Sequence, residues 1–386
     1  MNGTKNRALY LTVALGAVGL VALLLMLGAG PQPAAQAAGA TIKVPDHYAT
    51  IQAAIDAAAD GDTILVAAGY YTENLRITQP ITLSGGWNIS FTLQSPGAST
   101  IDGSGLGRVI SITCATSDTV VTVDGFTVQN GNATGLGGAP ASASAVKELP
   151  LRWAGSDSPE SLDLAARMAR LRTSLADVVD KGLYPGGAAA YQAMLDRVEE
   201  QIDDLENSEA QPHSTKSASQ QAADCGGGIY GWNTSLHLLN STIRYNIASL
   251  DGDGRGGGVC VGQAPPSGVL IAGSTFRENT GSAIMGATGE GGGLYTVEAP
   301  GVVIEDNNFN LNAASDAGFL SNGIGGGLMV WHSPDAVVRG NQVVRNTANA
   351  GTVALNGLGG GAYLGYSDGA TVEDNVLREN LAMVHG

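Results

Sequence analysis

The stretch GGGLYTVEAPGVVIEDNNFNLN, residues 291–312, dictates the architecture, because its pattern occurs in five copies along the chain. Each copy opens on a glycine triplet and closes on an asparagine. The triplets recur every 30 to 35 residues, at Gly226, Gly256, Gly291, Gly325 and Gly359. The asparagines keep the same period, at Asn246, Asn279, Asn312, Asn346 and Asn380. A fixed period of this length predicts a solenoid, in which each repeat buries its apolar face against its neighbours.

Within each copy, apolar residues alternate with polar ones in three short segments that turns separate. In the quoted copy these segments are centred on Leu294, Val303 and Phe309. Three short strands per repeat predict one coil of a parallel β-helix. Coils stacked about 4.8 Å apart place the periodic asparagines over one another, so we expect a ladder of side-chain amide hydrogen bonds. We expect the glycine triplets at the opposite corner, where positive φ or close backbone approach excludes a side chain.

Composition narrows the class of protein and its partners. The 386 residues are 44% hydrophobic and 14% charged, with 56 glycines, which fits a turn-rich all-β chain with a large core. The formal net charge is -16, so the protein repels phosphate backbones and anionic membrane surfaces. We therefore expect no nucleic-acid partner.

Residues 1–40 are predicted to direct export. Lys5 and Arg7 precede an apolar run over residues 8–30, and Ala35-Gln36-Ala37 has the form that signal peptidases accept. This pattern predicts a signal peptide and a secreted or cell-surface protein. The run is also long enough to span a bilayer, so an uncleaved N-terminal anchor is the alternative.

Residues 41–138 are predicted to hold a capping helix and the first coils, which gives about seven coils in the whole chain. The helix is expected from about Thr50 to Ala59, with Thr50 as N-cap and Ile51, Ala54 and Ile55 on its apolar face. A small apolar helix ahead of the first strand would cover the open end of the solenoid.

Residues 139–224 interrupt the period and are predicted to form an inserted α-helical hairpin with flexible flanks. Ser158-Pro159-Glu160 is typical of a helix start, and apolar residues recur at helical spacing on both sides of the turn at 181–187. The segment 150–210 offers an apolar stripe for self-association, unless its two helices bury that stripe against each other. Residues 225–386 carry the five repeats and end without a polar cap, so we expect a chain truncated at its C-terminus.

Two groups of motifs carry a resemblance to known families. GGGLY (291–295) and the Phe-x-x-Asn units at 276–279 and 309–312 resemble the paired motifs of polymorphic outer-membrane-protein repeats. YATIQAAI (48–55), GDTI (61–64) and YTEN (71–74) are similar to the opening of secreted pectin-lyase-like right-handed β-helix proteins. The resemblance covers about 41–135 and 225–386 and implies a right-handed parallel β-helix. It specifies function poorly, because that superfamily includes lyases, hydrolases, epimerases and adhesins.

No catalytic or metal-binding cluster emerges from the sequence. Enzymes of that superfamily resemble one another in a set of acidic residues on one strand face, and the chain shows no convincing set of this kind. Asp251-Gly252-Asp253-Gly254 could bind calcium, but it lacks the remaining acidic spacing of an EF-hand loop. We therefore name no catalytic residue, metal ligand or cofactor, and leave enzymatic activity open.

The three cysteines, Cys114, Cys225 and Cys260, are not expected to pair. Cys225 precedes one glycine triplet and Cys260 follows the next, an offset of five residues in stacked strands. Five residues span about 17 Å of extended chain, whereas a disulfide needs Cα atoms within about 7 Å.

Aromatic residues gather on the outward face of the first strand of the repeats and are the candidate ligand-binding residues: Tyr230, Trp232, Tyr295, Trp331 and Tyr363. Flat rings along a rigid sheet suit a polysaccharide. The alternative is that the loops leading into the triplets fold over these rings and bury them. Arg244, Arg277 and Arg378 form a second row, which could hold an acidic glycan or pair locally with glutamates.

The sequence thus favours an exported, non-enzymatic β-helix that binds polysaccharide or another surface component through an aromatic sheet face. One alternative is a polysaccharide lyase, hydrolase or epimerase of the pectin-lyase-like superfamily. Another is a structural adhesin or spacer.

Overall fold

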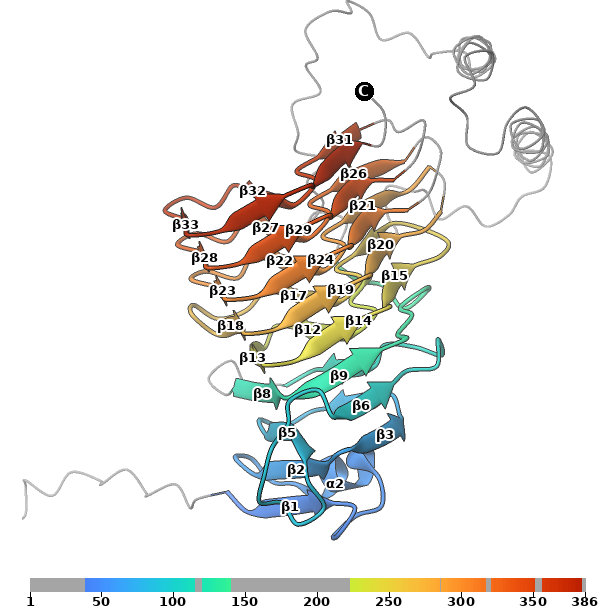
Figure 1. Cartoon of the computed structure of the whole chain (residues 1–386), viewed down its shortest axis with the longest axis vertical. Coiled ribbons are helices and arrows are strands. Elements are labelled where there is room, and N and C mark those ends of the chain that lie inside the picture. The colour runs from blue at the N-terminus through green and yellow to red at the C-terminus, as the bar shows by residue number, and fades with distance from the viewer. Residues whose placement is uncertain are drawn as a thin grey trace, which may run out of the picture.

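The computed structural model describes residues 39–114, 120–139, 223–284, 286–316, 321–350 and 356–383. Figure 1 shows a stack of coils that rises from β1 at the N-terminal end to β31–β33 at the other. The predicted signal segment falls outside these residues apart from Gly39 and Ala40, and the predicted helical hairpin falls outside them over 140–222.

Three sheets, named A, B and C, enclose the main core. Sheet A has nine strands: β1 (Thr41–Val44), β2 (Thr63–Ala67), β5 (Thr82–Trp87), β8 (Val120–Asp124), β13 (Ser235–Leu239), β18 (Val269–Ala272), β23 (Val303–Glu305), β28 (Val337–Arg339) and β33 (Thr371–Glu373). Sheet B has eight: β3 (Gly69–Thr72), β6 (Ser99–Asp102), β9 (Phe126–Gln129), β14 (Thr242–Arg244), β19 (Thr275–Arg277), β24 (Asn308–Asn310), β29 (Gln342–Val344) and β34 (Val376–Arg378). Sheet C has seven: β4 (Leu75–Ile77), β7 (Ile110–Ile112), β12 (Ile229–Trp232), β17 (Val259–Gly262), β22 (Leu294–Val297), β27 (Leu328–Trp331) and β32 (Ala362–Gly365).

Two smaller sheets, D and E, lie between the end of one coil and the start of the next. Sheet D contains β15 (Ile247–Ser249), β20 (Thr280–Ser282), β25 (Ala313–Ser315), β30 (Thr347–Asn349) and β35 (Leu381–Met383). Sheet E contains β10 (Gly138–Ala139), β11 (Ala223–Cys225), β16 (Gly254–Arg255), β21 (Thr288–Glu290), β26 (Asn322–Ile324) and β31 (Asn356–Leu358).

Each complete coil therefore runs through five short strands, in the order E, C, A, B and D, instead of the three expected. The two additional strands are only two or three residues long and lie in segments that the apolar pattern leaves unmarked. The number of coils differs slightly from the expected seven, because the sheets hold between five and nine strands in the described residues.

The predicted vertical register is present. In sheet C, Leu294 lies over Leu328 and Tyr295 over Met329, and the same one-to-one pairing continues through the neighbouring coils. Inward residues such as Phe276 and Phe309 stack with ring centroids 4.6 Å apart. Because successive residues point to opposite faces, this register fixes which side chains enter the core.

The periodic asparagines form the predicted ladder at the corner between sheets B and D. Each Nδ2 donates to the Oδ1 of the asparagine one coil on, at 2.9 Å from Asn246 to Asn279 and 2.9 Å from Asn279 to Asn312. The same Oδ1 also accepts the backbone N–H of the asparagine below it, and Nδ2 also donates to a backbone carbonyl. A second ladder at the corner between sheets A and B was not predicted, and it consists of Ser241, Ser274, Asn307, Asn341 and Asn375.

The glycine triplets lie beside the asparagine ladder, not at the opposite corner as predicted. In the copy at 291–293, Gly291 has φ +61, and a Cβ on Gly292 would overlap the carbonyl of Ala313 in sheet D. A Cβ on Gly293 would lie 3.2 Å from Cγ of Asn312. The chain passes between sheet D and the ladder as it turns from sheet E into sheet C, and only glycine fits there.

A short helix lies against the first coil, where a helix was expected. Helix α2 spans Ile51–Ala57, and the Thr50 hydroxyl caps it by accepting the Ala53 N–H at 3.2 Å. Ile51, Ala54 and Ile55 are buried against the first strands, and Figure 1 shows α2 beside β1 and β2. No helix within the described residues has the length and apolar character needed to cross a membrane.

The prediction that the cysteines do not pair is wrong for two of them. Cys225 and Cys260 form a disulfide with Cα atoms 5.6 Å apart, and Cys114 is a buried free thiol. The five-residue offset assumed that the chain stays extended through the triplet. Gly226 instead has φ +68 and reverses the chain, so that sheet E lies back over the outer face of sheet C.

We predict that Asn312→Ala destabilises the protein by about 3 kcal/mol, because the buried amide groups of Asn279 and the carbonyl of Phe276 lose their partner. Urea denaturation followed by circular dichroism measures the change. The matched control is Asn308→Ala, an exposed asparagine on β24, for which a change within about 0.5 kcal/mol is expected. Equal losses of unfolding free energy in the two variants would show that the ladder hydrogen bonds do not stabilise the protein.

We predict that the coils fold without residues 140–222. β10 pairs antiparallel with β11, so that Ala139 lies opposite Ala223 and a two-residue turn can join them. A chain with Asn-Gly in place of 140–222 should keep its melting temperature within about 5 °C. A molten or aggregated product would mean that the coils depend on the removed residues.

We predict that non-reducing peptide mapping links Cys225 to Cys260 and leaves Cys114 as a thiol. Reduction should lower the free energy of unfolding by about 3–4 kcal/mol, because the bond closes a loop of 35 residues. Cys114→Ser serves as the control and should preserve the link. A linkage that includes Cys114 would contradict the packing of sheet E on sheet C.

Candidate functional site

The predicted aromatic face of sheet C is largely covered by sheet E. Tyr295 and Trp331 are 0% exposed, and Tyr230, Trp232 and Tyr363 are partly buried. These rings form a second apolar core together with Cys225, Cys260, Ile324, Met329 and Leu358. The structure therefore follows the alternative in which the segments leading into the triplets cover the rings. The prediction that Tyr295 and Trp331 bind a ligand is wrong, because neither side chain is accessible.

The two tryptophans occupy space that glycines in the next coil leave open. Trp331 pairs in register with Gly365, and Trp232 pairs with Gly262. A Cβ on either glycine would overlap the indole ring. Each ring is thus held flat against the sheet by the backbone of the neighbouring coil.

The second core also contains a buried ion pair. Arg255 Nε lies 2.8 Å from Glu290 Oε2, and both side chains are almost fully buried. Burial alone would lower the pKa of Arg255, but the charge of Glu290 outweighs it and raises that pKa. A charged pair of this kind is stable only when both partners are present. Both residues lie in sheet E, on the neighbouring strands β16 and β21, and the Arg255 guanidinium lies over the Tyr295 ring of sheet C, 5.9 Å from its centroid.

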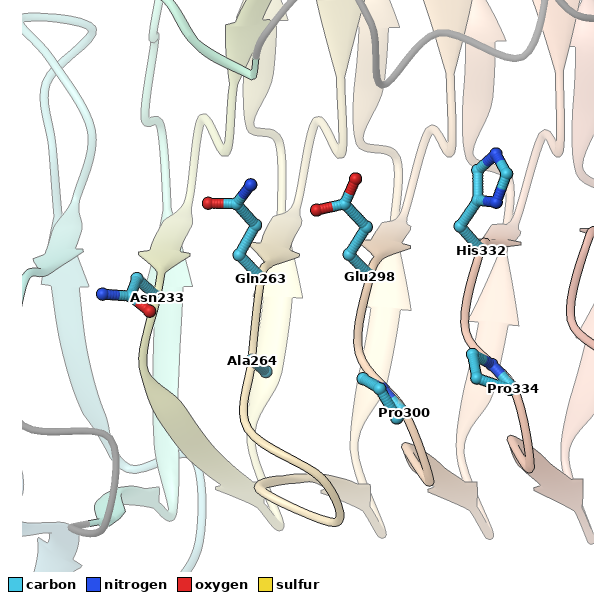
Figure 2. Close-up of a pocket in the computed structure, with 7 residues that line it drawn as sticks. All are labelled: Asn233, Gln263, Ala264, Glu298, Pro300, His332 and Pro334. Atoms are coloured by element: carbon cyan, nitrogen blue, oxygen red, sulfur yellow. The ribbon is translucent and has the colours of Figure 1, made fainter.

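The accessible part of this region is a groove along the turn between sheets C and A. The groove has a volume of about 850 Å³, and its lining residues are Asn233, Gln263, Ala264, Glu298, Pro300, His332 and Pro334. Figure 2 shows Gln263, Glu298 and His332 on three successive coils, with their side chains projecting to the same side. The groove therefore runs across the coils, along the axis of the solenoid.

The polar residues of the groove share one backbone conformation. The residue that directly follows each strand of sheet C has positive φ in five successive coils: Asn233 (54°), Gln263 (50°), Glu298 (49°), His332 (45°) and Tyr366 (46°). We name these five residues the corner row. Polar residues tolerate the left-handed conformation better than branched apolar ones do, which explains the side chains found there.

The corner row packs on aromatic residues of sheet C, of which Trp331 is fully buried and Trp232 is partly buried. Trp232 Nε1 donates to Gln263 Oε1 at 3.0 Å. The His332 ring stacks on Tyr366 with centroids 5.0 Å apart, and the edge of Trp331 contacts both rings. The aromatic residues predicted to bind ligand therefore position the row that does reach solvent.

Sequence reasoning missed the corner row, although a periodic signal was present. Each member stands seven residues after the first glycine of its triplet. The residue types differ from coil to coil, so no single side chain repeats, and only the position is periodic. The turn conformation that exposes it cannot be recognised from composition.

The groove offers hydrogen-bonding groups and apolar surface. Across the described residues, no group of three or more His, Cys, Asp or Glu side chains is arranged to hold a metal ion. Glu298 supplies acceptors, and Asn233 and Gln263 supply amides. Ala264, Pro300 and Pro334 provide apolar surface between them.

Comparison with known proteins gives one family match and some distant structural similarity. Residues 222–385 match the family model described as right handed beta helix region. The chain is similar to the pectin methylesterase of Aspergillus niger in its deglycosylated form, with 10% identity over 92% of this chain and 88% of that chain and a TM-score of 0.30. It is also similar to the family 28 exopolygalacturonase of Yersinia enterocolitica, with 17% identity over 89% of this chain and 66% of that chain and a TM-score of 0.23.

No curated protein matches the chain. At these TM-scores the two enzymes carry no argument about activity. The family match over residues 222–385, together with the stacked parallel coils, identifies the chain as a right-handed parallel β-helix protein.

Proposed function

We propose that this β-helix is an exported, non-enzymatic binding protein that holds an extended polysaccharide along the groove between sheets C and A. The observation that carries the proposal is the corner row, in which five successive coils each present one side chain at the same turn. A row with a constant spacing suits a ligand that is itself a linear repeat.

The direction of the groove favours a polymer over a small molecule. Coils stack about 4.8 Å apart, so a chain that lies along the solenoid axis meets a new side chain at each coil. Figure 2 shows Asn233, Gln263, Glu298 and His332 on successive coils, so a polymer can follow the row from coil to coil. Binding would then be the sum of modest contacts distributed over several coils.

The chemistry of the lining favours a neutral sugar chain in this groove. Glu298 accepts hydrogen bonds from hydroxyl groups, and the amide groups of Asn233 and Gln263 donate to them. Pro300 and Pro334 supply apolar contacts for the CH groups of a sugar. A polyanion would meet both Glu298 and a protein of net charge -16.

The N-terminal pattern supports a ligand outside the cytoplasm. Lys5, Arg7 and the apolar run that follows predict export, and extracellular surfaces are rich in polysaccharide. Release of products from polysaccharides, measured with and without calcium, would instead support the lyase, hydrolase or epimerase alternative.

We predict that Gln263→Ala combined with Glu298→Ala weakens retention by neutral polysaccharides at least about tenfold, because two hydrogen-bonding groups leave the groove. Affinity gel electrophoresis against a panel of neutral polysaccharides gives the dissociation constants. The matched control removes the same residue types from the exposed faces of sheets B and A, with Gln342→Ala and Glu373→Ala. Equal retention of both double variants would eliminate the groove as the binding site.

A further inference from the structure

We propose that the outer face of sheet B carries a second binding site, in which Arg244 binds an anionic substituent of a sugar chain whose rings stack on Tyr245 and, further along the sheet, on Tyr70. The substituent is a carboxylate or a sulfate ester. This site lies on a different sheet from the groove and stands independently of the function proposed above.

The foundation of the site is a buried carboxylate. Asp102, at the end of β6, is 3% exposed, and its Oδ2 accepts hydrogen bonds from the Tyr70 hydroxyl, from Gln129 Nε2 at 2.7 Å and from Asn130 Nδ2 at 2.6 Å. Burial by itself raises the pKa of Asp102, but these hydrogen bonds and one from Ser104 outweigh it and lower the pKa to about 2. Asp102 is therefore charged, and its acceptors are occupied by the protein.

The carboxylate fixes Gln129, and Gln129 fixes Arg244. With its Nε2 bound to Asp102, the Gln129 amide presents Oε1 to Arg244 Nε at 2.9 Å. The guanidinium lies over the ring of Tyr245, 5.5 Å from its centroid. These two contacts orient the arginine, and within the described residues its terminal NH2 groups have no hydrogen-bond partner. Carboxylates and sulfates bind such donors in pairs.

In the next coil, the arginine at the same position of sheet B is paired with a glutamate. Arg277 lies directly over Arg244 in the register of sheet B, and its NH2 group contacts Glu278 at 2.8 Å. Tyr245 takes the place of Glu278 after Arg244, with the same left-handed backbone at φ 57 and 54 respectively. Arg339 and Arg345 also contact glutamates, Glu305 and Glu379. Within the described residues, Arg244 has no carboxylate contact of this kind.

Two exposed rings belong to the site. Tyr245, 43% exposed, lies against the Arg244 guanidinium, and Tyr70, 64% exposed, is joined to the site through its hydroxyl on Asp102. The hydrogen bond to Asp102 raises the pKa of Tyr70, so that its hydroxyl stays neutral and its ring stays anchored. A ring against the cation and a second exposed ring on the same sheet suit a chain of flat sugar rings that carries a negative group.

The net charge of the protein sets the kind of polymer that fits. At -16, the chain repels a densely charged polyanion over most of its surface. Asp102 lies at the site as well, but its carboxylate accepts hydrogen bonds from Tyr70, Gln129 and Asn130. The site therefore favours a polymer in which anionic sugars are sparse among neutral ones.

The test compares three probes on one backbone: dextran, lightly carboxymethylated dextran and lightly sulfated dextran, by affinity gel electrophoresis at low salt. We expect tighter retention by one anionic form than by dextran, and the form that binds tighter distinguishes carboxylate from sulfate. Arg244→Gln and Tyr245→Glu should each reduce this anion-dependent gain at least about tenfold, the latter by supplying the carboxylate that Arg277 already has.

The matched control is Arg277→Gln, one coil away, which should leave the gain unchanged. The converse variant Glu278→Tyr should increase it, because it frees Arg277 and places a ring beside it. Circular dichroism and the melting temperature establish that each variant is folded. An equal gain in wild type, Tyr245→Glu and Arg244→Gln, or no gain in wild type, would overturn the proposal. The groove variant Gln263→Ala with Glu298→Ala should keep the gain, which separates this site from the groove.

Discussion

The registered stacking of one coil on the next is the constraint on which the rest of the structure depends. Each inward side chain lies over its counterpart, and the corners leave room for one amide per coil. The ladder from Asn246 to Asn380 supplies that amide, and each Oδ1 from Asn279 onward accepts two N–H groups from the coil below. The adjacent glycine triplets follow from the same packing, since a Cβ on Gly293 would press on Asn312. The asparagine ladder and the glycine triplets therefore pack against each other, so a substitution in one is expected to disturb the packing of the other.

The turn at the glycine triplets also determines which surfaces are accessible to a ligand. Because the triplet turns the chain back on itself, sheet E covers the outer face of sheet C and converts an aromatic row into a second core. The disulfide between Cys225 and Cys260 joins the two sheets within it. Arg255, paired with Glu290 inside sheet E, also lies over the Tyr295 ring of sheet C. Tyr295 and Trp331, predicted to contact a ligand, are therefore buried core residues. The accessible residues are displaced to the turn that follows each strand of sheet C.

Local patterns predicted the coils well, and tertiary turns limited the prediction of the site. Alternation of apolar residues and the period of the asparagines are properties of neighbouring residues, so they indicated the register of sheets A, B and C and the ladder. The position of sheet E depends instead on the turn at the first glycine of each triplet, which has positive φ in all five copies, for example +68 at Gly226. An extended chain was assumed there, and this one assumption produced the error about the cysteines, the missing short strands and the accessible aromatic face. The corner row was missed for a different reason, because its position repeats while its residue types do not.

Positions of interest in such a fold are those where one coil departs from the next. Backbone geometry is held constant by stacking, so a substitution at one coil changes the chemistry and leaves the scaffold as it is. Arg244 and Arg277 occupy the same place in sheet B, yet the residue that follows is Tyr245 in one coil and Glu278 in the other. The second arginine is neutralised by its neighbour and the first is held by Gln129. The neighbouring coil thus serves as an internal reference. Comparison of the two positions shows that the charge of Arg277 is paired with a carboxylate of the protein, whereas the charge of Arg244 is available to a ligand.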